Sequence, residues 1–341
     1  MRQGIAAAGN LIVDSIKTTD CYPEEGYLST ILSLGKSGGG APTNVSIDLS
    51  KMDSSLPIQV IGVVGSDEDG DYVIDLLKGN GIDTRGIKRD PTTATSFTDV
   101  INVESTGHRT FFHYRGANSL LDVEHFEFEK IDAKILHLGY ALLLDTLDSE
   151  DKEYGTRMAR VLAMAQKHGI KTSLDAVSES SDRFSSIVPH SLKHCNYFIV
   201  NEFEASLTTG IPDRDGAGML IVENMRAMCS KLLEMGVNDL AVIHAPEGGF
   251  AMEADGSYYV QPSLELPDGY IKGTVGAGDA FCSGVLYSLY NEWNTQRALE
   301  IAVSSAAQCL SHVNATDGMA DISVIKELYE KMEKQKLPLH R

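Results

Sequence analysis

The chain has little of what several large protein classes require. Its five cysteines are scattered and form no CxxC pair, which argues against a disulfide framework or a cysteine-based zinc site and fits a reducing cytoplasm. The longest apolar run, near Ile135, is too short to cross a bilayer and is broken by His137, Gly139 and Tyr140. The N-terminal stretch lacks the basic and apolar regions of a signal peptide. We therefore expect a cytoplasmic protein.

Positive charge is also scarce. The chain carries 48 acidic against 29 basic residues, a formal net charge of −19. Nucleic acid and anionic membranes bind basic surfaces, so neither is an expected partner. A phosphate site in this chain must therefore depend on backbone amides and a metal ion. No GxxxxGK[ST] loop, HExxH motif or GxGxxG fingerprint occurs, which excludes a P-loop kinase and gives no support to a zinc protease or a dinucleotide-binding domain.

Short β-like segments alternate with amphipathic helical ones through most of the chain. This alternation predicts an α/β fold with a mostly parallel sheet covered on both faces. No repeat, low-complexity tract or linker divides the sequence, so residues 1–341 are expected to form a single domain. The expected strands are 5–8, 59–64, 135–138, 171–175, 197–200 and 240–244, and the expected helices are 71–78, 150–167 and 219–235, with three more between 279 and 334.

Two stretches depart from this rhythm and predict a small separate sheet. Residues 95–103 and 109–114 are rich in Thr, Val and aromatics and flank a turn-like segment, and residues 18–34 have no helical period. We expect them to form a β-sheet lid, made of about residues 15–35 and 94–117. An apolar face on such a lid could pair with a second copy, so a homodimer through the lid is a hypothesis. A later hairpin is expected around Asp255 and Gly256.

A glycine-rich loop runs directly into a helix near the C-terminal end. Gly276, Ala277 and Gly278 are small, so the first backbone N–H groups of the helix face outward and, with the helix dipole, form an anion site. Asp279 in the first turn could accept the proton of an attacking hydroxyl group during phosphoryl transfer. The alternative is a tight turn whose acidic residue merely favours the helix dipole.

Asn201 and Glu204 lie three residues apart at the expected start of a helix. An amide and a carboxylate on one face suit hydrated Mg²⁺, which keeps most of its water ligands. The same N-x-x-E pattern is a capping box, in which the two side chains close the first turn. Taken alone, the pattern favours the cap, and both roles can coexist.

Four segments in order resemble the motifs of the ribokinase (PfkB-type) family of carbohydrate kinases. They read GGGAPTNV at 38–45, GVVGSDEDG at 62–70, NEFE at 201–204 and GTVGAGDAFCSG at 273–284, and they span nearly the whole chain. The resemblance implies a ribokinase-like three-layer α/β/α fold with a mostly parallel central sheet and a small β-sheet lid. It also implies transfer of the ATP γ-phosphoryl group to a sugar, with Mg²⁺ as the metal.

The resemblance assigns roles to individual residues. Asp279 would be the catalytic base beside an anion hole formed by Gly276, Ala277 and Gly278, and Asn201 and Glu204 would hold Mg²⁺ mostly through water. The nucleotide would contact Asn201, Glu204, Gly248, Thr274, Gly276, Gly278 and Asn314. The sugar would contact Asp14, which we expect to end the first strand, together with Gly39, Gly40, Asn44 and Arg115. Asn118 is a further candidate on the lid.

Three departures from the family pattern limit the prediction. Gly273 stands where an Asp often contributes to a monovalent-cation site, so the sequence does not predict activation by that route. His244 replaces a usual Thr or Ser near the nucleotide, and Asp175 is not followed by the usual Asn and Arg.

The glycine segment before Asn44 is more similar to fructokinases and ketodeoxygluconate kinases than to ribokinases. The sequence thus favours fructose or a related ketose or sugar acid, phosphorylated on a primary hydroxyl. A nucleoside kinase of the same fold and a non-catalytic nucleotide or sugar sensor are the alternatives.

Overall fold

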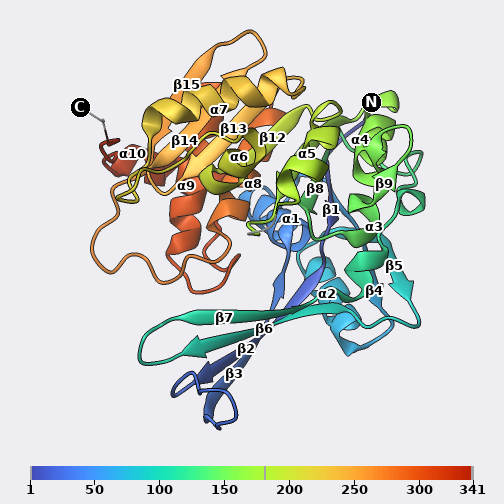
Figure 1. The fold of residues 1–341 in the computed structure, drawn as a ribbon, viewed down its shortest axis with the longest axis vertical. Helices are drawn as coiled ribbons and strands as arrows, with labels where there is room; N and C mark the ends of the chain where they lie inside the picture. Colours follow the sequence, from blue (N-terminus) through green and yellow to red (C-terminus); the bar gives the residue numbers. More distant parts are fainter. Residues whose placement is uncertain (1, 180–181, 339–341) are drawn as a thin grey trace.

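A nine-stranded sheet forms the centre of the molecule in the computed structural model, which describes residues 2–179 and 182–338 (Figure 1). Its strands lie in the order β15-β14-β13-β12-β11-β8-β1-β4-β5, parallel from β13 to β5, while β14 and β15 add an antiparallel edge. The strands are β1 (Ile5–Gly9), β4 (Ile58–Gly65), β5 (Asp83–Asp90), β8 (Ile135–Ala141), β11 (Lys171–Ala176), β12 (Tyr197–Asn201), β13 (Leu240–Ala245), β14 (Gly248–Glu253) and β15 (Tyr258–Pro262).

Helices cover both faces of this sheet and bury two separate cores. The central strand β1 reads IAAAG and is buried along its whole length, as expected for a parallel strand enclosed on both sides. One face carries α1 (Ala41–Met52), α2 (Glu68–Gly79), α8 (Ala277–Tyr290), α9 (Thr295–Leu310) and α10 (Ile322–Lys331). The other carries α4 (Arg157–Lys167), α5 (Phe184–Leu192), α6 (Glu202–Thr209) and α7 (Val222–Glu234). None of the helices in the described ranges is long and apolar enough to span a membrane.

A second sheet projects from the main body, at the bottom of Figure 1. Its order is β3-β2-β6-β7, with β2 and β6 parallel and the two outer pairs antiparallel. The strands are β2 (Ile12–Thr19), β3 (Ile31–Gly39), β6 (Ser96–Val103) and β7 (Arg109–Tyr114). The prediction of a small sheet built from two distant stretches is therefore confirmed, although its strands begin earlier and end later than about 15–35.

The expected elements are present, most within about three residues of their expected ends, and one helix begins much later than expected. The six expected strands and the three C-terminal helices all form. The helix expected over residues 150–167 begins only at Arg157, because β9 (Glu150–Asp151) and β10 (Gly155–Thr156) pair as a short hairpin before it. Gly155 has φ +87°, which interrupts a helix, and Thr156 Oγ1 caps the new one by accepting from the Ala159 amide at 3.1 Å.

Asn118 joins the two sheets. It lies in a short 3₁₀ helix (Gly116–Leu120) after β7 and is fully buried. Its side-chain Oδ1 accepts from the Leu11 amide at 3.0 Å, and its Nδ2 donates to the Leu11 carbonyl at 3.1 Å. Leu11 lies where the chain leaves β1 of the large sheet for β2 of the small one. Both ends of the Asn118 side-chain amide therefore bind backbone groups of Leu11. Asn118, a candidate site residue on the lid, thus has a structural role.

Replacing Asn118 with Ala should destabilise the fold. The change leaves the buried N–H and C=O of Leu11 without partners, and we expect the free energy of unfolding to fall by about 2–4 kcal/mol. Urea unfolding measures this. Asn102→Ala, at a partly exposed position of β6, is the control and should cost less than about 0.5 kcal/mol. Equal losses of unfolding free energy in the two variants would contradict the role of Asn118 in joining the two sheets.

Candidate active site

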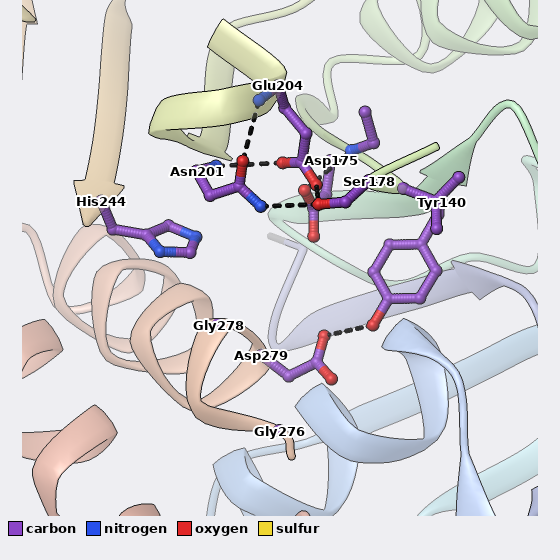
Figure 2. A pocket seen from close by; sticks show the side chains of 11 residues that line it. Tyr140, Asp175, Ser178, Asn201, Glu204, His244, Gly276, Gly278 and Asp279 are labelled. Atoms are coloured by element: carbon purple, nitrogen blue, oxygen red, sulfur yellow. Dashed lines mark hydrogen bonds between the residues drawn. The ribbon is translucent and has the colours of Figure 1, made fainter. Parts of the chain in front are cut away.

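The candidate site lies at the carboxyl edge of the large sheet, where open α/β sheets bind ligands. Tyr140, Asp175, Asn201 and His244 come from the ends of four neighbouring strands, β8, β11, β12 and β13. The first turn of α8, with Asp279, approaches them from the opposite side of the cavity (Figure 2). Segments from the middle and the end of the chain therefore meet at one place.

The loop before α8 has the geometry of an anion site. Gly276 is the N-cap residue, with φ +81°, and a Cβ built on it would lie 2.6 Å from the Cα and O atoms of Ala315. Only glycine fits this close approach and this backbone conformation. The helix begins at Ala277, so the amides of its first turn have no intrahelical acceptor. Together with the helix dipole, these amides can hold a developing negative charge.

Asp279 is buried and hydrogen-bonded through both carboxylate oxygens. Asn44 Nδ2 donates to Oδ2 at 2.8 Å, and the Tyr140 hydroxyl donates to Oδ1 at 2.8 Å. Burial raises the pKa of Asp279 to about 6, while the bonds from Asn44 and Tyr140 oppose the rise. The carboxyl group is therefore ionised at neutral pH but holds a proton more readily than an exposed aspartate. Such a group suits general-base chemistry.

Asn44 reaches Asp279 because α1 begins close to the end of β1. Gly40, its N-cap residue, has φ +86°, and a Cβ there would lie 1.9 Å from the carbonyl oxygen of Asn10. One turn further along α1, Asp48 is fully buried, and neither of its carboxyl oxygens has a partner among the described residues. Burial first, and the charge of Asp279 second, raise the pKa of Asp48 well above its usual value. Asp48 was not predicted.

Asp14 lies on the small sheet and does not end the first strand as expected. The first strand stops at Gly9, and Asp14 lies in β2, because the chain passes from one sheet to the other in between. Its carboxyl group packs against Gly39, where an added Cβ would lie 2.6 Å from Oδ2. Burial raises the pKa of Asp14 to about 6; a bond from Thr98 lowers it and the charge of Asp279 raises it. The predicted sugar-site residues Asp14, Gly39 and Asn44 are therefore grouped beside Asp279, the predicted base.

Arg115 lies just beyond β7 and binds the loop that follows β8. Its Nη1 donates to the Leu142 carbonyl at 3.2 Å and forms an ion pair with Asp145 at 2.7 Å. Arg183 Nη1 donates to the same carbonyl at 3.1 Å. Arg115 thus connects the small sheet to the end of β8, close to Tyr140.

Asn201 and Glu204 form the capping box, which confirms that alternative. The Glu204 amide donates to Asn201 Oδ1 at 2.8 Å, and the Asn201 amide donates to Glu204 Oε2 at 3.0 Å. The Ser178 hydroxyl donates to Glu204 Oε1 at 2.7 Å (Figure 2). Burial raises the pKa of Glu204 to about 7. The pKa of Asp175 is raised well above its usual value, first by burial and second by the charge of Glu204.

These oxygen-bearing side chains line a cavity of about 280 Å³ that extends to Gly276 and Gly278. A hydrated Mg²⁺ ion fits such a site, because it binds oxygen atoms and keeps several waters. A cation would also favour the charged forms of the two buried carboxyl groups, whose high pKa values reflect uncompensated burial. Across residues 2–179 and 182–338, no three His, Cys, Asp or Glu side chains are close enough to hold a metal directly.

A second cavity, of about 670 Å³, lies beside the first. Thr274, Ala277 and Gly278 line it, and so does His244, whose ring packs on Phe281 with centroids 4.9 Å apart. Its apolar walls include Leu264, Leu266, Ile271, Val303, Ala306 and Leu310. This apolar slot, ending at the anion site, has the shape and chemistry for a nucleotide base with its phosphates toward Gly278.

Two predicted nucleotide contacts lie outside both cavity linings. Gly248 begins β14, and Asn314 binds Asp317 through its side chain at 2.9 Å in the loop after α9. Conversely, the sequence analysis did not single out Tyr140 as a site residue. Its position at the carboxyl end of a predicted strand was the available signal.

Residues 3–322 match the family model of the pfkB family carbohydrate kinases. The chain belongs to this family. It is 24% identical to a 5-dehydro-2-deoxygluconokinase of Clostridium botulinum, covering 90% of this chain and 88% of that protein. It is 25% identical to a deoxyribokinase of Salmonella typhi (89% and 91% covered) and 26% identical to fructokinase-2 of Oryza sativa (96% of each).

Solved structures share the fold. A ribokinase from Arabidopsis thaliana, complexed with ribose and ATP, superposes with a TM-score of 0.79 at 18% identity over 97% of this chain and 99% of that one. A ribokinase from Thermotoga maritima gives 0.77 at 17% identity, over 96% and 100%. The ribokinase-like fold predicted from the sequence is therefore confirmed, and this pfkB protein is a carbohydrate kinase, a phosphotransferase.

Proposed function

We propose that this pfkB kinase transfers the γ-phosphoryl group of ATP to a primary hydroxyl of a sugar, with a ketose such as fructose or a related sugar acid as the favoured acceptor. The observation that carries the proposal is the buried Asp279 carboxylate, which lies in the first turn of α8 directly beside the amides that follow Gly276. A base and an anion hole adjacent on one turn are what phosphoryl transfer to a hydroxyl requires.

The reaction follows from this arrangement. The acceptor hydroxyl oxygen forms a bond to the γ-phosphorus, the bond between that phosphorus and the bridging oxygen of ADP breaks, and Asp279 takes the hydroxyl proton. The amides of Gly278 and Asp279 stabilise the charge on the transferring group. Asn44 keeps the carboxylate oriented through Oδ2.

Asn201, Glu204 and Asp175 are the residues that would hold Mg²⁺, mostly through its waters. The ion would neutralise charge on the phosphate oxygens. No monovalent cation is included, because a side chain at Gly273 would lie 2.7 Å from the Val313 carbonyl oxygen, so the position has room for no ligand of its own.

The acceptor class is supported by the small-sheet side of the site. Asp14 can accept from sugar hydroxyls, and Asn44 offers both donor and acceptor atoms nearby. The relatives act on a dehydro-deoxygluconate, deoxyribose and fructose, according to their names, so these three acceptors head the panel below.

The first test measures ADP release from Mg-ATP with fructose, 5-dehydro-2-deoxygluconate, deoxyribose, ribose and adenosine. At least one sugar should support turnover, and Asp279→Asn should lower kcat by about 10²–10⁴, because the general base is lost. kcat/KM should fall as the pH drops through about 6, where Asp279 becomes protonated.

Three other outcomes of this test would contradict the proposed sugar kinase or its mechanism. Turnover with adenosine alone would indicate a nucleoside kinase. Ligand binding without turnover on any acceptor would indicate a sensor. Full activity of Asp279→Asn would refute the mechanism.

Glu204→Gln separates the cap from the metal role. Glutamine can still accept from the Asn201 amide, so the unfolding temperature should change little, whereas the lost charge should raise the Mg²⁺ concentration for half-maximal activity about tenfold or more. Glu300→Gln is the matched control, since Glu300 pairs with Arg297 on α9 and lies outside both cavity linings. If the Mg²⁺ dependence of Glu204→Gln is unchanged, Glu204 has only the capping role.

A second copy of the chain is the proposed partner of the small sheet. Leu34 and Phe112 there are 76% and 55% exposed, and the outer edges of strands β3 and β7 have no strand partner within the described residues. Sedimentation equilibrium should give twice the 37.0 kDa of one chain, and Leu34→Lys should shift it toward the monomer. Val324→Lys, 43% exposed on α10, should remain dimeric. A monomeric wild type would contradict the pairing.

A further inference from the structure

Tyr140 has a fixed position in the candidate site. It lies at the end of β8, where its backbone amide donates to Asn10 Oδ1 at 2.7 Å. Its hydroxyl crosses the cavity to Asp279 Oδ1 at 2.8 Å, as Figure 2 shows. Tyr140 lines the 280 Å³ cavity together with Gly276, Gly278 and Asp279, so its hydroxyl bonds to the base within the same cavity that the anion loop borders.

The hydrogen-bonding position on Asp279 Oδ1 is also the one that the hydroxyl group of the acceptor needs. A nucleophile must donate its proton to Asp279 while its oxygen faces the phosphorus held near Gly278. Asn44 donates to Oδ2 of Asp279 from α1, and we take Oδ1, which faces Tyr140 in the cavity lining, as the oxygen that receives the proton of the nucleophile. Oδ1 accepts a hydrogen bond from the Tyr140 hydroxyl.

The Tyr140 hydroxyl keeps its proton under all ordinary conditions. Burial first, and then the charges of Asp279 and Asp175, raise the pKa of Tyr140 well above 10. The phenol therefore always donates to Asp279 and never repels it as a phenolate would.

We propose that the Tyr140 hydroxyl occupies the acceptor position on Asp279 Oδ1 until the sugar hydroxyl displaces it, and that it thereby keeps water from reacting with ATP. The inference rests on the proposed function, since it assigns Asp279 as the base. A water molecule that donated to Oδ1 beside the anion loop would be a competing nucleophile, and the phenol denies it that place. Tyr140 is thus a positioning residue that acts through Asp279.

The first measurement is ADP release from Mg-ATP without any acceptor. Tyr140→Phe keeps the ring and removes only the hydroxyl, and it should raise this release about threefold to tenfold, the effect of one lost hydrogen bond. Tyr287→Phe is the matched control, because the Tyr287 hydroxyl donates to Asp53 at 3.4 Å away from the site. The double change Tyr140→Phe with Asp279→Asn should abolish the rise. Unchanged release in Tyr140→Phe would overturn the inference.

The second measurement is acceptor binding without nucleotide, by titration calorimetry with the panel sugar that has the highest turnover. Tyr140→Phe should bind it about threefold to tenfold more tightly, since no hydroxyl must be displaced. Weaker binding would overturn the inference, because it would show that the hydroxyl contacts the bound sugar directly.

The two measurements separate this inference from the proposed function. If no panel sugar supports turnover in the wild type, the proposed function fails, while a rise in acceptor-free hydrolysis in Tyr140→Phe still supports the role of Tyr140. If turnover occurs but the variant changes neither hydrolysis nor sugar binding, only the role of Tyr140 fails.

Discussion

The structure around the site depends on one buried carboxylate. Asp279 is bonded by Asn44 from the first helix and by Tyr140 from a central strand, so three segments far apart in the chain meet on two oxygen atoms. The meeting is close because Gly276 and Gly40 have positive φ values where side chains would collide with neighbouring backbone. These glycines bring two helix N-termini against the strand ends. A shift in either helix would separate the base from its partners.

The charge of the site follows from the same packing. Asp14, Asp175, Glu204 and Asp48 all have raised pKa values, and burial is the first cause in each case. Asp175, Glu204 and Asp279 line one cavity, and they would repel a phosphate chain if all were ionised and uncompensated. The arrangement therefore requires cationic charge or dipoles from elsewhere, and the first turn of α8 supplies the dipole. A bound divalent cation is the natural counterpart of the remaining acids.

The sequence allowed prediction of the features that short segments encode. Strand and helix patterns, the glycine loop before Asp279 and the capping box at Asn201 are local, and each is found where expected. Contacts between segments far apart in the chain could not be predicted from the sequence. No spacing rule links Tyr140 to a carboxylate 139 positions away. Asp14 was assigned to the wrong strand because the apolar runs on either side of Gly9 and Asn10 were read as one strand, although these two residues separate β1 from β2.

The two sheets are joined at the same strand ends that carry the site. Asn118 binds the backbone of Leu11 after β1, and Arg115 binds the carbonyl of Leu142 after β8. Asn10 and Tyr140 lie one and two residues from these joints and are bonded to each other at 2.7 Å. A sugar bound to Asp14 on the small sheet would therefore contact a sheet that is hydrogen-bonded to the segments after β1 and β8, which position Tyr140. If Tyr140 acts as proposed, these hydrogen bonds are the path by which acceptor binding at Asp14 would affect Asp279 Oδ1.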